Sequence, residues 1–238
     1  MARVASLLPM LTGYGQPVEV RLPTRQTHDQ RDVNCCVSCA IGAAMEARDP
    51  SMPALAPLFH FFFAGGQGAI ESGLTIPRAQ GALLQRGICA LARHSYDIAR
   101  ANVSLRPSVA AVQDGFTRRL LDRSAGTLLW RPVSIATSPT PLLRHLAAGF
   151  PVILGLQPNA PYLALKQSNP VLDDSRPPFS SVGHAAAVIG YDGVERVFIV
   201  QDSRGLSFGA QGQWFLPYDR CTSPFIVLAF ALAPDSLD

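Results

Sequence analysis

Hydrophobic and polar residues follow two different periods along this chain, helical in the first half and strand-like in the second. Apolar and small residues recur at helical spacing in four segments, which predict helices at residues 36–47, 53–63, 76–86 and 139–148. Gly87 follows the third segment, at the position that a helix C-cap favours. The first segment is rich in Ala, which suits a helix packed on all sides.

Runs of β-branched and aromatic residues dominate the second half. They are separated by Gly, Pro and Asp, and they predict strands at residues 151–157, 184–192, 196–203, 212–219 and 225–232. Consecutive strands of this kind predict an antiparallel sheet or barrel. Residues 102–131 are ambiguous, and residues 159–183 are predicted to form a long loop. Loops of this length in compact domains are often functional.

Composition narrows the classes of function. The chain has 238 residues, 48% hydrophobic and 16% charged, so it can bury a core as one large domain or two lobes. A net charge of +3 from dispersed Lys and Arg is too small to indicate a nucleic acid or a membrane surface as partner. No stretch approaches the ~18 apolar residues that span a bilayer. Five cysteines, an odd number at low density, imply a free thiol and no disulfide scaffold, and favour a cytoplasmic location.

Three of the cysteines, Cys35, Cys36 and Cys39, crowd the start of the first predicted helix. A thiol becomes a nucleophile when its pKa is lowered, and a helix N-terminus and a neighbouring imidazole both lower it. Cys36 stands where the polar stretch DQRDVN gives way to the helix, near unpaired backbone N–H groups. Cys36 is therefore the candidate nucleophile. The predicted role of Cys35, Cys89 and Cys221 is that of small buried hydrophobic residues.

The segment DQRDVNCCVSCAIGAAME resembles the DQG-x-x-G-S-C-V-A-F-A segment of bacterial papain-like cysteine peptidases, the C1 family. The resemblance implies that Cys36 attacks the substrate carbonyl and that Gln30 donates to the oxyanion. A second register compares C-V-S-C with the C-G-S-C of the plant enzymes, in which the first cysteine is disulfide-bonded. It would make Cys39 the nucleophile. That register places Val33 where the glutamine must stand, and valine has no side-chain donor, so Cys36 is preferred.

The second half continues the resemblance. SSVGHAAAVIGYD looks like the family's G-G-H-A-V-x-x-V-G-Y, which makes His184 the imidazole that pairs with the thiol. FIVQDSRGLSFGAQGQWFLPYD resembles the run that carries the orienting Asn and its shielding Trp, but Asp202 and Arg204 stand at those positions. A carboxylate can still accept the ring N–H of His184. The alternative is that Asp202 is an ordinary solvated acid at a strand end. Separately, the loss of the shielding Trp leaves open a weakened or non-hydrolytic site.

The substrate-binding residues are less specifically marked. The segment from LAPLFHFFFAGG to ESGLTIPRAQGALLQRGIC resembles the family region in which a glycine lets the substrate backbone pair along the cleft. Gly73 is the candidate, with Ser72 beside it, because glycine has no Cβ to obstruct a close approach. A turn glycine is the alternative. Gly183, which precedes the histidine, is assigned to the same group. No paired spacing of Cys and His indicates a metal, and no cofactor is expected.

The resemblance implies an α+β, papain-like fold for the whole chain. A helical lobe at about 28–130 faces an antiparallel β-barrel lobe at about 131–232, which segment 17–23 joins, and the active-site cleft lies between the lobes. The implied activity is peptide-bond hydrolysis on a peptide or protein substrate, without an inhibitory propeptide. Acyl transfer or deamidation by the same residues, and a pseudoprotease that serves as a binding module, are the alternatives. A secreted effector without a cleavable signal peptide is the alternative to the cytoplasmic location, and the oligomeric state is open.

Overall fold

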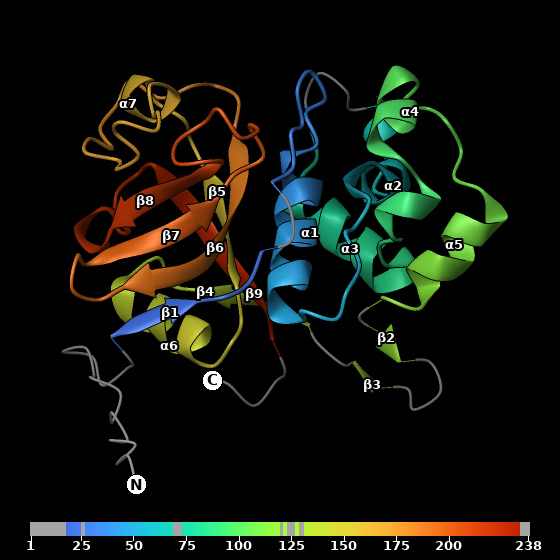
Figure 1. Ribbon diagram of the computed structural model, residues 1–238, viewed down its shortest axis with the longest axis horizontal. Coiled ribbons are helices and arrows are strands. Elements are labelled where there is room, and N and C mark those ends of the chain that lie inside the picture. The colour runs from blue at the N-terminus through green and yellow to red at the C-terminus, as the bar shows by residue number, and fades with distance from the viewer. Residues whose placement is uncertain are drawn as a thin grey trace, which may run out of the picture.

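The computed structural model describes residues 18–24, 27–68, 73–119, 121–122, 127–128 and 131–233. A group of helices lies on one side and an antiparallel sheet on the other, with helix α1 (Cys36–Arg48) between them (Figure 1). The predicted α+β class is confirmed. Among the described residues, none of the helices combines the length and the apolar character that crossing a bilayer requires.

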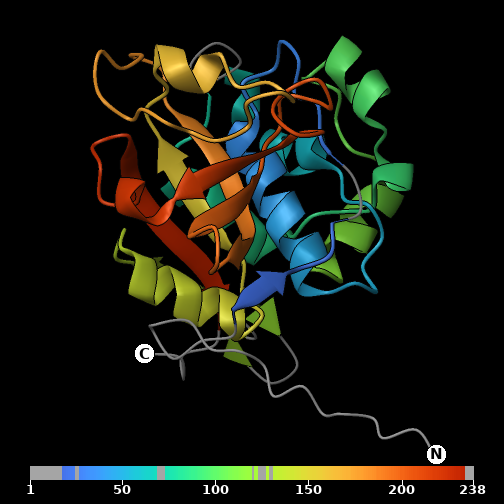
Figure 2. The same cartoon turned by 60° about the vertical axis from the view of Figure 1, so that its left-hand side comes forward.

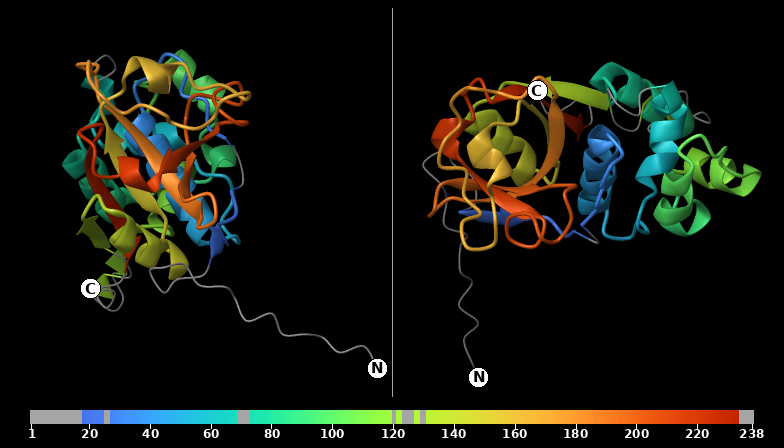
Figure 3. Two further views of the ribbon diagram at one scale, coloured as in Figure 1. Left: turned by 90° about the vertical axis from the view of Figure 1, so that its left-hand side faces the viewer. Right: turned by 90° about the horizontal axis from the view of Figure 1, so that it is seen from above.

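Helices cover the side of α1 that faces away from the sheet, as the view from above shows (Figure 3). These are α2 (Pro57–Phe63), α3 (Ile76–Arg86), α4 (Tyr96–Ala101) and α5 (Val109–Phe116), whereas α6 (Pro139–Ala147) and α7 (Ala160–Leu163) belong to the sheet side. Three-residue 3₁₀ helices lie at Gly66–Gly68, Leu91–Arg93 and Tyr218–Arg220. The four predicted helices are confirmed. The second begins four residues later than predicted, because the chain before it is extended and Leu55 forms a β-bridge with Ala90.

The sheet contains seven strands in the described residues, in the order β4-β9-β5-β6-β7-β8, with β1 beside β6. They are β1 (Glu19–Arg21), β4 (Arg131–Ile135), β5 (Val152–Leu156), β6 (His184–Asp192), β7 (Val197–Gln201), β8 (Gln213–Pro217) and β9 (Ile226–Ala233). All pairs are antiparallel, and β1 pairs with the end of β6 that extends past β5. A separate pair joins β2 (Leu121–Asp122) to β3 (Thr127–Leu128). The five predicted strands are confirmed.

The structure corrects the prediction of a barrel, because the described sheet is not closed. Strands β4 and β8 are its two edges and do not pair with each other. The edge of β8 is occupied instead by the segment around Val171. The Leu172 backbone N–H donates to the Phe215 carbonyl at 2.9 Å, and the Phe215 N–H donates to the Pro170 carbonyl at 2.9 Å. The loop thus supplies backbone partners that an edge strand otherwise lacks.

Small residues on both partners bring α1 close to the sheet. The helix is buried over nearly its whole length and packs its alanines against Ala185 and Ala187 of β6. Because neither surface carries large side chains there, the helix backbone and the strand backbone approach closely, and the start of α1 comes beside the start of β6. A larger residue at Ala187, which is 0% exposed, would cost about 1–3 kcal/mol by overpacking.

A second core fills the other face of the sheet and includes Trp214, Phe225 and Tyr162 of α7. Tyr162 is held at the beginning of α7 by Asn159, whose side-chain oxygen accepts the Tyr162 backbone N–H at 3.0 Å. Helix α7 and the start of α1 lie at the same end of the molecule in both views (Figures 1 and 2). This end therefore gathers residues from the helix, the sheet and the long loop.

Candidate active site

Cys36 is the first residue of α1, and it is 8% exposed. The first turn of the helix contains no acidic residue that would offset the positive end of the helix dipole. Helix geometry also leaves the Cys36 backbone N–H without an acceptor inside the helix. The thiol and a free N–H donor therefore occupy the same helix terminus.

His184, the first residue of β6, interacts with both other candidate catalytic side chains. Its Nε2 donates to Asp202 Oδ1 at 2.9 Å, and its ring interacts electrostatically with the Cys36 side chain, which lines the same cavity. Because Nε2 is engaged by the carboxylate, Nδ1 is the ring nitrogen left for the thiol. The structure thus brings the Cys36 thiol, the His184 imidazole and the Asp202 carboxylate together at one site.

The Asp202 carboxylate is buried and accepts several hydrogen bonds. Oδ1 accepts from His184 and from the Ser203 backbone N–H at 2.8 Å. Oδ2 accepts from the Tyr162 hydroxyl at 2.9 Å and from Trp214 Nε1 at 2.9 Å. Its side chain is 0% exposed, so the alternative of a solvated acid does not describe this residue. Tyr162 and Trp214 cover it, in place of a tryptophan at position 204.

The charges of this pair shift both pKa values. Burial by itself would lower the pKa of His184, but the Asp202 charge, the hydrogen bond to it and the interaction with Cys36 raise that pKa to about 9. Burial would raise the pKa of Asp202, yet the His184 charge and the donors around the carboxylate lower it. The pair is therefore an imidazolium and a carboxylate at neutral pH.

Gln30 is oriented by a residue that follows Asp202. The Ser203 hydroxyl donates to Gln30 Oε1 at 2.6 Å, and the Gln30 backbone N–H donates to the Ser203 carbonyl at 2.8 Å. Since the amide oxygen is occupied, the amide nitrogen of Gln30 remains to donate. Gln30 and Cys36 line the same cavity. The arrangement provides two N–H donors beside the thiol, as an oxyanion site requires.

A cavity of about 480 Å³ opens beside the thiol. Its wall includes Cys36, His184 and two of the predicted substrate-binding residues, Gly73 and Gly183. Gly73 has φ +73°, and a Cβ there would lie 3.2 Å from the Asn34 carbonyl oxygen, so both conformation and space favour glycine. A Cβ at Gly183 would meet only an ordinary contact of 3.5 Å. Ser72 lies outside the described residues.

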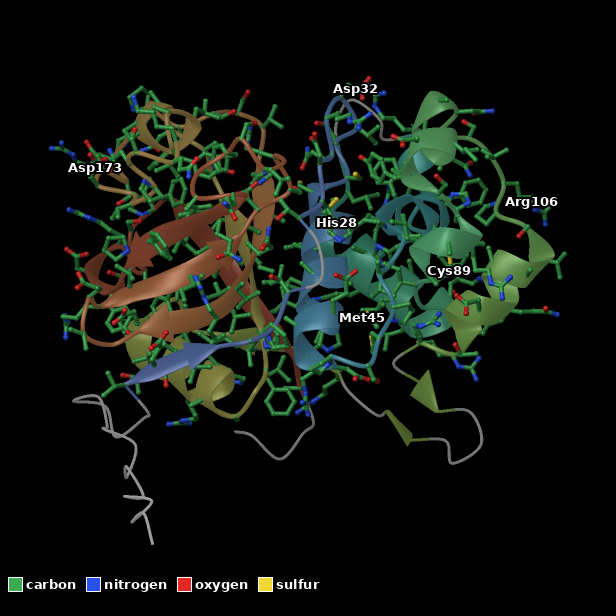
Figure 4. The ribbon with its side chains drawn as sticks, viewed as in Figure 1. His28, Asp32, Met45, Cys89, Arg106 and Asp173 are labelled. Carbon is green, nitrogen blue, oxygen red and sulfur yellow. The ribbon has the colours of Figure 1, made fainter. Side chains whose placement is uncertain are left out.

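The other cysteines are separate from this cavity. Cys39 is 1% exposed and packs among the residues of the helical side; its hydrogen bond with Cys35 and its burial raise its pKa well above the ordinary value. The five cysteines are all free, and the disulfide of the alternative register is not formed. Cys89 lies among the helices away from the sheet (Figure 4). The described residues contain no group of His, Cys, Asp or Glu that could hold a metal ion.

Tyr162, Trp214 and Ser203 contact the site, and the sequence did not single them out. Tyr162 lies in a segment expected to be loop, and nothing in its neighbours marks it. Trp214 belongs to a predicted strand, where an aromatic residue signals core packing. Ser203 directly follows Asp202, and this adjacency is the one signal that could have pointed to it.

Comparisons with known proteins agree with the fold. The family model described as Peptidase_C39 like matches residues 130–216, a part that includes His184 and Asp202 but not Cys36. None of the curated proteins matches the chain significantly. Among solved structures, xylellain, a cysteine protease from Xylella fastidiosa, matches with a TM-score of 0.76 and 19% identity over 98% of this chain and 94% of that one.

Two further structures match over most of the chain. Digestive procathepsin L 3 of Tenebrio molitor larval midgut has a TM-score of 0.70 and 16% identity, over 98% of this chain and 73% of that one. The bromelain protease from Ananas comosus, solved with an inhibitor, has a TM-score of 0.69 and 14% identity, over 92% and 100%. At these identities the likeness establishes the fold. The chain has a papain-like fold.

Proposed function

We propose that this chain is a cysteine peptidase that hydrolyses peptide bonds in peptide or protein substrates. The observation that carries the proposal is His184, hydrogen-bonded to a buried Asp202 and lining the wall of one cavity with Cys36. The papain-like fold and the cysteine proteases among the structural matches support it.

The mechanism follows from the positions of the donors. The Cys36 sulfur, as thiolate, adds to the substrate carbonyl carbon, and the oxyanion accepts hydrogen bonds from the Gln30 amide and the Cys36 backbone N–H. The carbon–nitrogen bond then breaks, and imidazolium His184 gives its proton to the leaving amine. Water adds to the thioester while His184 takes its proton, and the acid is released with the thiol restored. Asp202 holds the imidazole in one tautomer throughout.

Labelling with iodoacetamide tests the nucleophile and the register together. We expect one cysteine to react far faster than the others at neutral pH, and peptide mapping by mass spectrometry should identify it as Cys36. Cys36→Ala should abolish both rapid labelling and cleavage of a peptide library. Cys39→Ala is the matched control, because it removes a buried thiol on the same helix that does not line the cavity; it should retain both.

Two results would contradict the proposal. Rapid labelling that survives in Cys36→Ala would assign the nucleophile elsewhere. Uniformly slow labelling of all cysteines, together with no cleavage, would favour the reading of the chain as a binding module.

Acyl transfer is a second candidate, and the aspartate at position 202 favours it. A full charge beside His184 keeps the imidazole protonated to higher pH than a neutral amide would, which suits a thioester that waits for an amine. Incubation with peptides and a primary amine separates the two reactions. An acyl product joined to the amine indicates transfer, and the free acid alone indicates hydrolysis.

A further inference from the structure

Arg204 reaches the same cavity as the catalytic side chains. It lies in the segment after β7, two residues beyond Asp202, and lines the wall with Cys36 and His184. Its Nε donates to the Tyr162 hydroxyl at 3.1 Å. The guanidinium lies 5.3 Å from the ring centre of Tyr162 and 5.5 Å from that of Phe208. The side chain is therefore held by one hydrogen bond and two aromatic faces, and its terminal nitrogens remain as donors.

The charge of Arg204 has no carboxylate partner in the described part of the chain. Other arginines form ion pairs there, for example Arg100 with Asp32 at 2.6 Å and Arg118 with Asp114 at 2.6 Å. Both oxygens of nearby Asp202 already accept hydrogen bonds from other groups. The described wall of the cavity contains no Asp, Glu or Lys. The cavity wall thus presents a guanidinium and no acidic side chain, although the charges of the buried Asp202 and of the Cys36 thiolate also act on Arg204.

Arg204 lies on the imidazole side of the thiol. Arg204 and His184 both lie beside the Tyr162 ring, whose centre is 5.8 Å from the His184 ring and 5.3 Å from the guanidinium. In the proposed mechanism His184 protonates the leaving amine, so the leaving part of the substrate approaches this side. The part of the substrate nearest to Arg204 is then the residue that follows the scissile bond.

We propose that Arg204 binds a carboxylate on the leaving-group side of the scissile bond, so that the enzyme prefers substrates with a negative charge there. The inference rests on the proposed peptidase function and names the substrate class of that site. A guanidinium whose stem is fixed by stacking can meet a carboxylate with two parallel hydrogen bonds. The carboxylate belongs either to the side chain of the first leaving residue or to a free C-terminus close to the scissile bond.

Paired peptide libraries distinguish these sources. Each library has random residues before the scissile bond. In the first pair the first leaving residue is Asp or Asn, and the C-terminus is amidated. In the second pair the leaving residue is Ala, and its C-terminus is a free acid or an amide. The measured quantity is the ratio of kcat/KM within each pair, which cancels any general loss of catalysis. We expect the acidic member to be favoured about tenfold in one pair, as for one charge-assisted hydrogen bond of about 1.4 kcal/mol.

Variants of Arg204 test whether the preference comes from this residue. Arg204→Gln should reduce the ratio to about one, and Arg204→Glu should reverse it and favour a Lys leaving residue. Arg196→Gln is the matched control, because Arg196 also lies over a tyrosine ring, that of Tyr218 at 5.5 Å, but does not line the cavity. The control should keep the ratio of the wild type.

The outcomes separate this inference from the function on which it rests. Cleavage with ratios near one in both pairs overturns the role of Arg204 and leaves the peptidase proposal standing. A preference that survives in Arg204→Gln also overturns it. Absence of any cleavage by a chain that labels at Cys36 overturns both the peptidase proposal and the inference.

Discussion

Two buried histidines, one on each side of the molecule, differ in what they contact. His60 lies on α2 among the helices; its Nε2 donates to the Ala79 carbonyl at 2.8 Å, and its Nδ1 accepts from the Ser38 hydroxyl at 2.9 Å. His184 begins β6, and its Nε2 donates to the carboxylate of Asp202. Burial lowers the pKa of His60 to about 4, although the bond to Ala79 opposes this. At His184 the carboxylate overcomes burial, and the pKa is about 9.

The difference shows that burial alone does not indicate whether a histidine has a structural or a catalytic role. A buried imidazole with neutral partners stays neutral at pH 7 and is a structural hydrogen-bonding group. His184, whose buried imidazole is hydrogen-bonded to the Asp202 carboxylate, is charged at pH 7, so it can stabilise a thiolate and has a proton to give. The carboxylate partner is what distinguishes His184 from His60.

Removing the carboxylate gives the largest expected effect. Asp202→Ala leaves the imidazole buried without its acceptor, so we expect kcat/KM at neutral pH to fall ~100-fold or more. Asp202→Asn keeps an acceptor oxygen and removes the charge. It should lose less activity, but the alkaline limb of its pH profile should move to lower pH by at least about one pH unit. The pH dependence of kcat/KM from pH 5 to 10 measures both.

The wild-type profile sets the reference for these variants. The rate of a site that needs imidazolium should fall as pH rises through about 9, the pKa of His184. Asp219→Asn, a change at an exposed acid paired with Arg220, is the control and should leave the profile unchanged. An Asp202→Asn profile that coincides with the wild type would mean that the carboxylate charge does not set this pKa.

Local patterns predicted the elements of the fold, because period and turn residues report the neighbourhood of each segment. The Ala-rich helix at residue 36, the small-residue strand at 184 and the Gly after residue 86 were all recognisable. The open edge of the sheet was not, because it depends on Val171 and its neighbours meeting β8 across the loop. Helices α4 and α5 lie in stretches whose apolar spacing is short or mixed with polar residues, and tertiary packing decides them.

Titration of His60 is expected to have the next largest effect, on stability. In the unfolded chain a histidine has a pKa near 6.5, and in the folded chain that of His60 is about 4. As pH falls below 6.5 the unfolded state binds a proton that the folded state does not. The free energy of unfolding therefore decreases as pH falls towards 4. Between pH 7 and 5, the titration of His60 accounts for about 2 kcal/mol of this decrease.

His60→Gln removes the titrating ring and keeps a donor for the Ala79 carbonyl. We expect a flatter dependence of the unfolding free energy on pH between 7 and 5, measured by urea denaturation, at some cost in stability at pH 7. His184 contributes with the opposite sign, since its stabilisation is complete below pH 6.5 and is lost as pH rises through about 9. A variant with the same slope as the wild type would show that His60 is not the group responsible.

For the candidate site, as for the fold, the sequence predicted the features that depend on local patterns and missed those that depend on tertiary contacts. Cys36, His184 and Asp202 each stand in a local pattern that marks a helix start, a strand start or a strand end, whereas their mutual contact requires the close approach of α1 to β6. Tyr162 has no such pattern. It reaches Asp202 from 40 residues earlier in the chain, and only the folded loop brings it there.

Tyr162→Phe has the smallest expected effect, and it tests most specifically how the Asp202 carboxylate sets the pKa of His184. Tyr162→Phe removes the hydroxyl that donates to Asp202 Oδ2 and keeps the ring in the core. That donor lowers the pKa of Asp202 by sharing its charge. Without it the carboxylate acts more strongly on His184, so the alkaline limb should move slightly to higher pH, opposite to Asp202→Asn, with less than a ~10-fold change in kcat/KM.

Tyr218→Phe, at a partly buried hydroxyl that donates to the Asp192 carbonyl, is the matched control and should change neither the alkaline limb nor kcat/KM. A limb that moves to lower pH would mean that Tyr162 acts by positioning Asp202 rather than by sharing its charge.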